Sequence, residues 1–247
     1  MNPDALLQLF DRVSVAVAAA VAAADRRAIG GRPGQYRLDL DADAVVVAPL
    51  LEAGLGVLSE ESGRHGEGRE ITVVVDPVDG STNASRGLPC WATSLCAVDV
   101  EGPLAAVVVD QSRNVTYRAV RGGGATRQIG DGPLEAISVA AAVPLAESVL
   151  AINGLSEDRP ISWQFRALGS AAVELCLVAD GSLDGYINLD PDSHGSWDYL
   201  GALLVVTEAG GVAADRAGRA LLSLEHAERR TIAASSCPSL LREMMNR

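Results

Sequence analysis

One run of eight residues, Asp76-Pro77-Val78-Asp79-Gly80-Ser81-Thr82-Asn83, has the spacing most suggestive of chemistry in this chain. Its two carboxylates lie three residues apart around a proline, so both can point at one place, and the Val78 carbonyl can add a third oxygen. Hard divalent cations prefer such all-oxygen ligands, and Mg²⁺ typically binds one or two carboxylates together with waters and a substrate phosphate. The residues Gly80, Ser81 and Thr82 offer backbone N–H groups that can hold an anion beside a metal. The alternative is a β-hairpin, because Asp-Gly is a strong turn signal.

Two further acidic segments lie far from this run in the sequence. Glu60 and Glu61 follow a predicted strand in a Gly- and Ser-rich context, where a charged turn is the alternative to a functional site. Asp198 lies at the start of a helix predicted over Ser196–Ala209, where it can also be a simple N-terminal cap. The same helix ends in Glu208-Ala209-Gly210-Gly211, with glycine at the usual position for termination.

Together, the three segments resemble the signature of the inositol monophosphatase family, the Mg²⁺-dependent, lithium-sensitive phosphatases. Ser59-Glu60-Glu61 is similar to the family's Gly-Glu-Glu-like pair, and Asp76 to Asn83 match its Asp-Pro-(Ile/Val/Leu)-Asp-Gly-(Thr/Ser)-(Thr/Ser)-Asn motif without a gap. Trp197-Asp198 and Glu208 to Gly211 match its third motif. Order and separation also agree, and the resemblance extends from the first helix almost to the C-terminus.

The resemblance implies specific roles for these residues. The implied ligands of two to three Mg²⁺ ions are Glu60, Asp76, the Val78 carbonyl, Asp79 and Asp198. Asp76 would bridge two ions, while Glu60 and the Ser81 hydroxyl would orient and deprotonate the attacking water, without a covalent phosphoenzyme. Glu60, Ser81 and Asp76 are thus the expected catalytic residues. The implied substrate-binding residues are Gly80, Ser81, Thr82, Gly169, Ser170, Ala171, Asn188 and Asp198.

Departures from the family pattern leave the substrate open. Where many inositol-specific members have a Glu, this sequence has Asn188, and the connection from Leu189 to Ser196 is longer. In the first loop the family's Lys is missing, and only Asp39, Asp41 and Asp43 remain, which predicts a looser third metal site. Inositol monophosphate is the family default, whereas histidinol phosphate, a sugar phosphate, fructose 1,6-bisphosphate and a 3′-phosphoadenosine nucleotide are substrates of relatives.

A non-catalytic metal- or phosphate-binding protein is the alternative of another class. The completeness of the ligand set argues against it, because a protein that had lost its activity would be free to lose a ligand. The aromatic content of only 4% disfavours the nucleotide, since it leaves few rings on which a base could stack.

Composition excludes several other functions. A net charge of -12 leaves no basic face for nucleic acids or anionic membranes. All 20 basic residues are Arg, which excludes a Schiff-base lysine and a Walker loop. The four cysteines show no CxxC spacing, which argues against a zinc ribbon or a thioredoxin motif. No targeting segment is predicted, so we expect a cytoplasmic protein. The resemblance implies a small phosphorylated metabolite as its partner. The resemblance alone implies a homodimer.

Interleaved helices and strands predict a layered α/β (α+β) sandwich, and the resemblance implies the inositol monophosphatase-like fold of alternating helix pairs and β-sheets. We expect one domain over 1–247, with sub-regions of about 1–130 and 131–247 that divide near the glycines at 122–132.

Between an amphipathic first helix ending at Ala24 and a helix over Ala42–Ala53, the polar stretch Arg26 to Asp43 predicts a loop. The pair Arg229-Arg230 predicts a solvated turn. The remaining predicted helices are Ala171–Ala179, Ser196–Ala209 and Pro238–Asn246, and the strands are Ile71–Val75 ending at Asp76-Pro77, Ser94–Val100, Leu104–Val109, Tyr117–Val120 as an edge, Ser148–Asn153, Gly185–Leu189, Val212–Ala214 and Thr231–Ala234.

Overall fold

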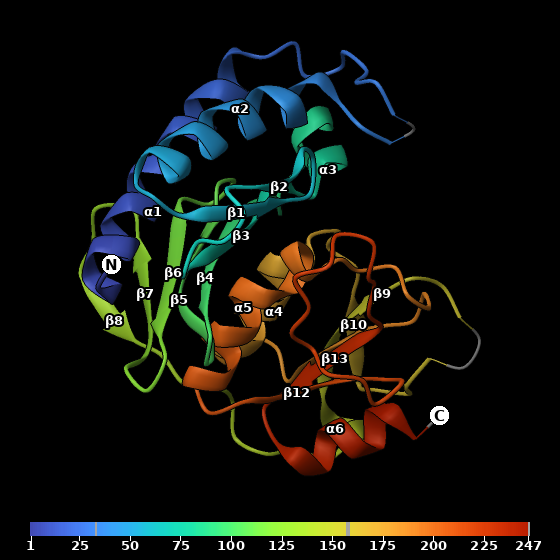
Figure 1. Cartoon of the computed structure of the whole chain (residues 1–247). Coiled ribbons are helices and arrows are strands. Elements are labelled where there is room, and N and C mark those ends of the chain that lie inside the picture. The colour runs from blue at the N-terminus through green and yellow to red at the C-terminus, as the bar shows by residue number, and fades with distance from the viewer. Residues whose placement is uncertain (33, 157–158, 247) are drawn as a thin grey trace.

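Five layers of helices and sheets build the molecule, as seen in a computed structural model that describes residues 1–32, 34–156 and 159–246 (Figure 1). Helices α1 (Pro3–Ala23) and α2 (Arg37–Glu52) cover one face of the first sheet. Helices α4 (Ala171–Ala179) and α5 (Ser196–Glu208) lie between the two sheets, and α6 (Pro238–Met245) covers the second sheet. The predicted layered α/β fold is confirmed.

The first sheet has eight strands in the order β2-β1-β3-β4-β5-β6-β7-β8, and all neighbours are antiparallel except β1 and β3. Its strands are β1 (Gly56–Ser59), β2 (Gly63–His65), β3 (Thr72–Asp79), β4 (Ala92–Asp99), β5 (Gly102–Asp110), β6 (Val115–Val120), β7 (Gly124–Ile129) and β8 (Leu134–Ala136). The second sheet has the order β10-β9-β11-β13-β12. Its strands are β9 (Val149–Asn153), β10 (Gln164–Arg166), β11 (Gly185–Asn188), β12 (Val212–Asp215) and β13 (Ile232–Ser235).

Helix α1 buries one apolar face against α2 and β5. Leu6, Phe10, Val17 and Val21 recur at helical spacing and are almost fully buried. Within the described residues, α1 is also the one helix that is long and apolar enough to cross a membrane. Its buried face gives it the character of a core helix.

Helices α4 and α5 are apolar on nearly all sides because each contacts elements of both halves of the molecule. The contact of α5 with the first sheet is close at Gly201, where a Cβ would lie 2.8 Å from the Ser94 hydroxyl. This packing fixes the first turn of α5 over the end of β3. It thereby brings two distant sequence motifs together.

Several predicted boundaries are wrong, for local reasons. Helix α2 begins at Arg37, not at Ala42, because the Asp39 carboxylate accepts a hydrogen bond from the Tyr36 N–H and caps the helix. Strand β3 continues through Pro77 to Asp79, because the ladder with β4 shifts register between Asp76 and Asp79 and needs no proline N–H there.

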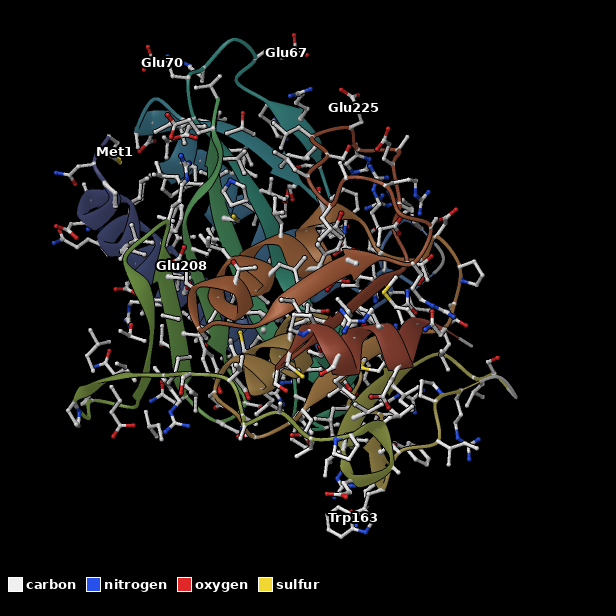
Figure 2. All side chains as sticks on the ribbon, turned by 90° about the horizontal axis from the view of Figure 1, so that it is seen from below. Met1, Glu67, Glu70, Trp163, Glu208 and Glu225 are labelled. Atoms are coloured by element: carbon white, nitrogen blue, oxygen red, sulfur yellow. The ribbon has the colours of Figure 1, made fainter. Side chains whose placement is uncertain are left out.

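Other differences concern the edge of the first sheet and two short elements. Strand β6 is interior and not an edge, since β7 and β8 extend the first sheet to Ala136, beyond the expected division near residue 130. The short helix α3 (Ser81–Arg86) and strand β10 were also missed. Acidic residues such as Glu67, Glu70 and Glu225 project outward from the fold (Figure 2), unlike the acidic residues described next.

Candidate active site

Two of the predicted ligands come from neighbouring strands that end side by side. Strands β1 and β3 are parallel, with Ser59 opposite Val75, so the next residues, Glu60 and Asp76, emerge together. The Glu60 N–H continues this pairing by donating to the Val75 carbonyl at 3.1 Å. Parallel pairing therefore turns two sequence-distant acids into neighbours at the end of the sheet.

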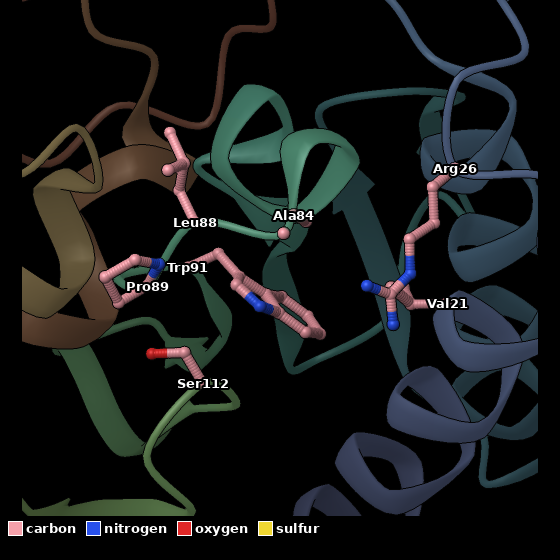
Figure 3. Close-up of a pocket in the computed structure, with 8 residues that line it drawn as sticks. Val21, Arg26, Ala84, Leu88, Pro89, Trp91 and Ser112 are labelled. Carbon is pink, nitrogen blue, oxygen red and sulfur yellow. The ribbon is translucent and has the colours of Figure 1, made fainter.

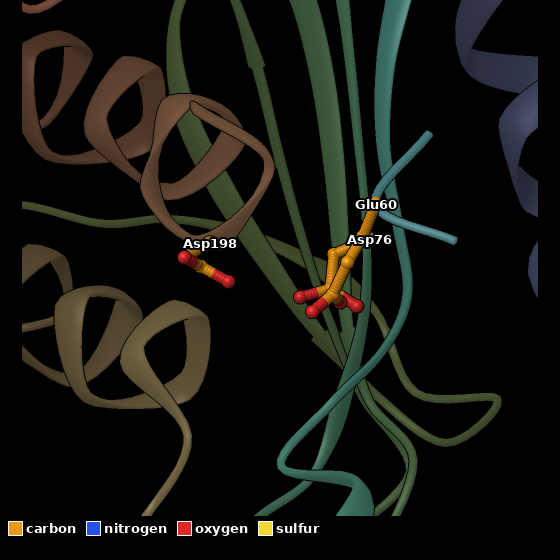
Figure 4. Close-up of side chains that lie close together, drawn as sticks. All are labelled: Glu60, Asp76 and Asp198. Carbon is orange, nitrogen blue, oxygen red and sulfur yellow. The ribbon is translucent and has the colours of Figure 1, made fainter. Parts of the chain in front are cut away.

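The third ligand comes from the helix between the sheets. Asp198 lies in the first turn of α5, where its Oδ2 accepts a 2.7 Å hydrogen bond from the Gly195 N–H. Figure 4 shows its carboxylate directed toward those of Glu60 and Asp76. One oxygen from each of the three residues lies within 4.8 Å of the others, a spacing suited to one shared cation.

Asp79 lies beside this cluster and is held by the start of α4. Its Oδ2 accepts hydrogen bonds from the Ser170 hydroxyl and the Ala172 N–H, both at 2.6 Å. Ser170 and its neighbours Gly169 and Ala171 were predicted to bind substrate. In the structure, Ser170 caps α4 and orients Asp79, so its clearest contact is with a predicted metal ligand.

The four carboxylates of Glu60, Asp76, Asp79 and Asp198 lie close to one another, and the basic group beside them is the imidazole of His194, 3.5 Å from Asp198. Burial, followed by repulsion from neighbouring carboxylates, raises the pKa of Glu60 and of Asp76 well above the ordinary range. Burial, followed by repulsion from Asp198, raises the pKa of Asp79 to about 6. Among the described residues, no arginine forms an ion pair with any of the four.

A divalent cation fits this arrangement. The donors are all carboxylates, which suit a hard ion, and a cation would favour their ionised forms. Asp39 independently supports a cation at this site, because its Oδ1 is buried without a hydrogen-bond partner among the described residues. Burial raises the pKa of Asp39 to about 7. Of the other two aspartates predicted near a third metal, Asp41 is paired with Arg37 and Asp43 accepts the Ser59 hydroxyl.

The turn after β3 packs tightly against the segment before α4. Gly80 has φ +87° and a Cβ there would lie 2.9 Å from the Cys90 carbonyl and 3.0 Å from the Gly169 carbonyl, so only glycine fits. The Asn83 amide fastens the same contact by donating to the carbonyls of Cys90 and Leu168, both at 2.8 Å. Ser81 and Thr82 then open the short helix α3.

A cavity of about 270 Å³ adjoins the acidic cluster. It is lined by Arg32, Gly34, Gln35, Asp39, Glu60, Glu61, Ser81, Trp197, His226 and Arg229. The sequence predicted Glu60 and Ser81, but no pattern pointed to Gln35, His226 or Arg229. These three come from irregular loops, and the His226 Nε2 lies 3.1 Å from the Glu60 carbonyl oxygen.

Asn188 is not among the residues that line this cavity, and its role in substrate binding stays a prediction. Its side chain is fully buried, and its amide nitrogen donates to the Asp190 carbonyl and the Ser193 hydroxyl. The amide oxygen accepts from the Asp190 N–H. Asn188 therefore holds the loop after β11, because its polar groups are used within that loop.

The same loop brings His194 to Asp198. The His194 Nδ1 lies 3.5 Å from the Asp198 Oδ2, and its Nε2 lies 2.7 Å from the Tyr186 hydroxyl. Burial lowers the pKa of His194, but the hydrogen bond and charge of Asp198 outweigh this effect and raise it. The sequence offered no motif that marked this histidine.

A second cavity of about 350 Å³ lies behind α3, where Arg26 faces Trp91 (Figure 3). Its lining has no carboxylate. It therefore has no ligand set for a hard cation, and the cavity beside Glu60 remains the candidate site.

Comparison with known proteins adds independent findings. Residues 37–247 match the model of the inositol monophosphatase family. The chain is 34% identical over 206 residues to the inositol-1-monophosphatase of Mesorhizobium japonicum, covering 75% of this chain and 74% of that protein. It is 32% identical over 206 residues to the Nus factor SuhB of Pasteurella multocida, covering 77% and 72%. A solved structure from Pyrococcus horikoshii, described as having similarities to inositol-1 monophosphatase, has the same fold with a TM-score of 0.83 at 22% identity, covering 98% and 96%.

Proposed function

The chain belongs to the inositol monophosphatase family and is a phosphoric monoester hydrolase, and from this premise we propose that it hydrolyses a small phosphomonoester with the help of Mg²⁺. One observation carries the proposal. Oxygens of Glu60, Asp76 and Asp198 converge within 4.8 Å, none of the three pairs with a described arginine, and His194 lies 3.5 Å from Asp198. Such an arrangement is costly for a folded protein unless a cation occupies it.

The proposed ligands are Glu60, Asp76, Asp198, Asp79 and the Val78 carbonyl, for two to three ions. When bound, Mg²⁺ would neutralise phosphate charge and make the attacking water more acidic. Asp76, which is 1% exposed, would be the most deeply buried of these carboxylate ligands. Ser170 and Ala172 would keep the Asp79 carboxylate in place through their hydrogen bonds to Oδ2.

The remaining chemistry belongs to the chain's own groups. Glu60 and Ser81 line the same cavity, and we assign them the orientation and deprotonation of the attacking water. The backbone N–H groups of Gly80, Ser81 and Thr82 would hold the phosphate oxygens as negative charge builds up. The close packing of Gly80 on the Gly169 carbonyl makes this turn rigid, which favours precise positioning.

For the substrate, we propose a small phosphorylated metabolite, with inositol monophosphate first and histidinol phosphate or another sugar or nucleotide phosphate as alternatives. Asn188, at the position where many inositol-specific members have a Glu, is uncharged and buried, which weakens the case for inositol specificity. We further propose a single domain over 1–247 that acts as a cytoplasmic homodimer, on the family resemblance. Although one relative is named a Nus factor, a net charge of -12 argues against nucleic acid as a direct ligand.

Phosphate release with Mg²⁺ tests the proposal across inositol-1-phosphate, histidinol phosphate, fructose 1,6-bisphosphate, glycerol 2-phosphate and 3′-phosphoadenosine 5′-phosphate. We expect one preferred ester, with the activity lost in Asp76→Asn and on chelation of the metal. Absence of release from every ester by folded, metal-loaded protein would favour a non-catalytic binding role.

A further inference from the structure

Arg229 lines the cavity beside the acidic cluster and is held there by uncharged partners. Its guanidinium carbon lies 4.7 Å from the centre of the Trp197 ring, next in sequence to Asp198. Its NH1 group donates to the carbonyls of His226 at 2.6 Å and Glu228 at 3.0 Å. The side chain is half-buried, although the sequence predicted a solvated turn here. Carbonyls and an indole fix the guanidinium without neutralising its charge.

Other arginines around the cavity do have acidic partners. Arg32, on the opposite loop, pairs with Glu61 at 2.6 Å. In the segment that carries Arg229, Arg219 pairs with Asp215 and Asp192, and Arg230 pairs with Glu228. Within the described ranges, by contrast, Arg229 forms no ion pair with a carboxylate. It is thus a preorganised cation that faces the cavity with its charge available.

We propose that Arg229 binds a second anionic group of the substrate, so that this enzyme prefers phosphomonoesters that carry a further phosphate or carboxylate. The inference rests on the proposed function, in which metal ions and the turn at Gly80 hold the reacting phosphate. The Arg229 guanidinium lines the same cavity and forms no ion pair with a described carboxylate. A second anionic group of the substrate can therefore bind to it. Arginine forms charge-assisted, bidentate contacts with either phosphate or carboxylate, so the shared chemistry is a planar or tetrahedral oxyanion.

Steady-state kinetics of Arg229→Gln with three esters tests this proposal. Fructose 1,6-bisphosphate carries a second phosphate, 3-phosphoglycerate carries a carboxylate, and glycerol 2-phosphate carries neither. The matched control is Arg64→Gln, which removes one positive charge from an exposed arginine 3.9 Å from Glu225, outside the cavity lining. Arg229→Lys keeps the charge but loses the fork geometry.

We expect Arg229→Gln to lower kcat/KM about ten- to a hundredfold for the preferred ester with a second anionic group and less than about threefold for glycerol 2-phosphate. Arg229→Lys should recover part of the loss, and Arg64→Gln should match the parent. Comparison of fructose 1,6-bisphosphate with 3-phosphoglycerate identifies which anion Arg229 serves. An equal loss for all three esters, or no loss for any, would overturn the proposal.

A binding readout separates this inference from the proposed function. In an Asp76→Asn background, which should not turn over, calorimetric titration with fructose 1,6-bisphosphate and with 3-phosphoglycerate reports affinity alone. Adding Arg229→Gln should weaken binding of the preferred ester about tenfold. Unchanged binding of both would contradict the role of Arg229 even if the parent enzyme is active. If instead the parent releases phosphate from no ester, the proposed function fails first.

Discussion

Two groups of buried acids in this molecule are treated in opposite ways. At the end of β12, Asp215 is 1% exposed and accepts hydrogen bonds from the Arg219 side chain and from the Thr231 N–H. Burial raises the pKa of Asp215, but these hydrogen bonds more than reverse the effect and lower it to about 2. Asp76 is equally buried, yet its nearest charged neighbours are other carboxylates, and its pKa is raised.

The ionised form of Asp215 stabilises the fold, whereas the ionised form of Asp76 destabilises the metal-free fold. Asp215 ties β12 to the loop before β13 with its counter-ion inside the chain. The Glu60–Asp76–Asp198 cluster has no arginine partner among the described residues, and its basic neighbour is His194, 3.5 Å from Asp198. One histidine does not offset three clustered carboxylates, so a cation from outside the chain would balance the remaining charge. A buried acid without an internal partner is therefore the better marker of function here.

Replacement of Asp76 by Asn should give the largest effect on activity. The change keeps the shape of the side chain but removes the charge of a proposed metal ligand, so Mg²⁺-dependent phosphate release should fall on the order of a thousandfold or more. Thermal unfolding of the metal-free variant should occur at an equal or higher temperature, because one repelling carboxylate is gone. Activity near the parent level would remove Asp76 from the proposed site.

The metal-free protein should lose stability as pH rises. Asp39, Asp79 and Glu174, a buried residue of α4, have folded pKa values raised by burial to about 7, about 6 and about 8, above their unfolded values near 4. Between those limits the folded state binds more protons than the unfolded state, so the free energy of unfolding falls with increasing pH. Taken together, the three shifts correspond to a loss of about 7 kcal/mol between pH 5 and 8 with chelator present.

Urea unfolding at the two pH values measures this loss, and Mg²⁺ should restore more stability at pH 8 than at pH 5. A free energy of unfolding that increases over this range without metal would contradict the assignment of raised pKa values.

Asp215→Asn should give the reverse pattern of Asp76→Asn. The lowering of the Asp215 pKa from 3.8 to about 2 corresponds to about 2 kcal/mol of stability at neutral pH, lost in the variant. Activity per folded molecule should stay within about threefold of the parent, because Asp215 lies outside the cavity lining. Chemical unfolding and phosphate release, measured on one preparation, would show whether the two groups of acids are as distinct as the geometry indicates.

The smallest effect should come from Asp39→Asn, with Asp41→Asn as its matched control. Asp39 lines the cavity with an unpartnered oxygen, so its loss should raise the Mg²⁺ concentration for half-maximal activity about fivefold. Asp41 is 36% exposed and paired with Arg37, so its loss should leave the Mg²⁺ requirement unchanged. Identical Mg²⁺ titrations of both variants would rule out a metal-related role for Asp39.

Much of the fold could be predicted from hydrophobic periodicity, because long apolar helices and strands make up most of it. The helices over Ala171–Ala179 and Ser196–Glu208 and the hairpin of β4 and β5 were predicted within a few residues. Short polar elements such as β8 and β10 have fully exposed burial patterns and no hydrophobic alternation, so nothing in the sequence marked them.

The active-site residues were likewise predictable only where a sequence motif marks them. Its acids sit in compact motifs that a single sequence reveals, and these motifs implied Glu60, Asp76 and Asp198 before the structure placed them together. Arg229 and His226 reach the cavity from a loop of ordinary composition, and only tertiary packing on Trp197 brings them there. Asn188 shows the same limit, since its sequence position gave no sign that its amide is used within its own loop.

Anomalous diffraction from crystals soaked in Mn²⁺, a substitute for Mg²⁺, tests the central claim most directly. The account predicts an anomalous peak in contact with the carboxylates of Glu60, Asp76 and Asp198, present in the parent and in Asp215→Asn but lost or much reduced in Asp76→Asn. Millimolar Mn²⁺ that leaves this cluster empty in the parent, or an undiminished peak in Asp76→Asn, would contradict it.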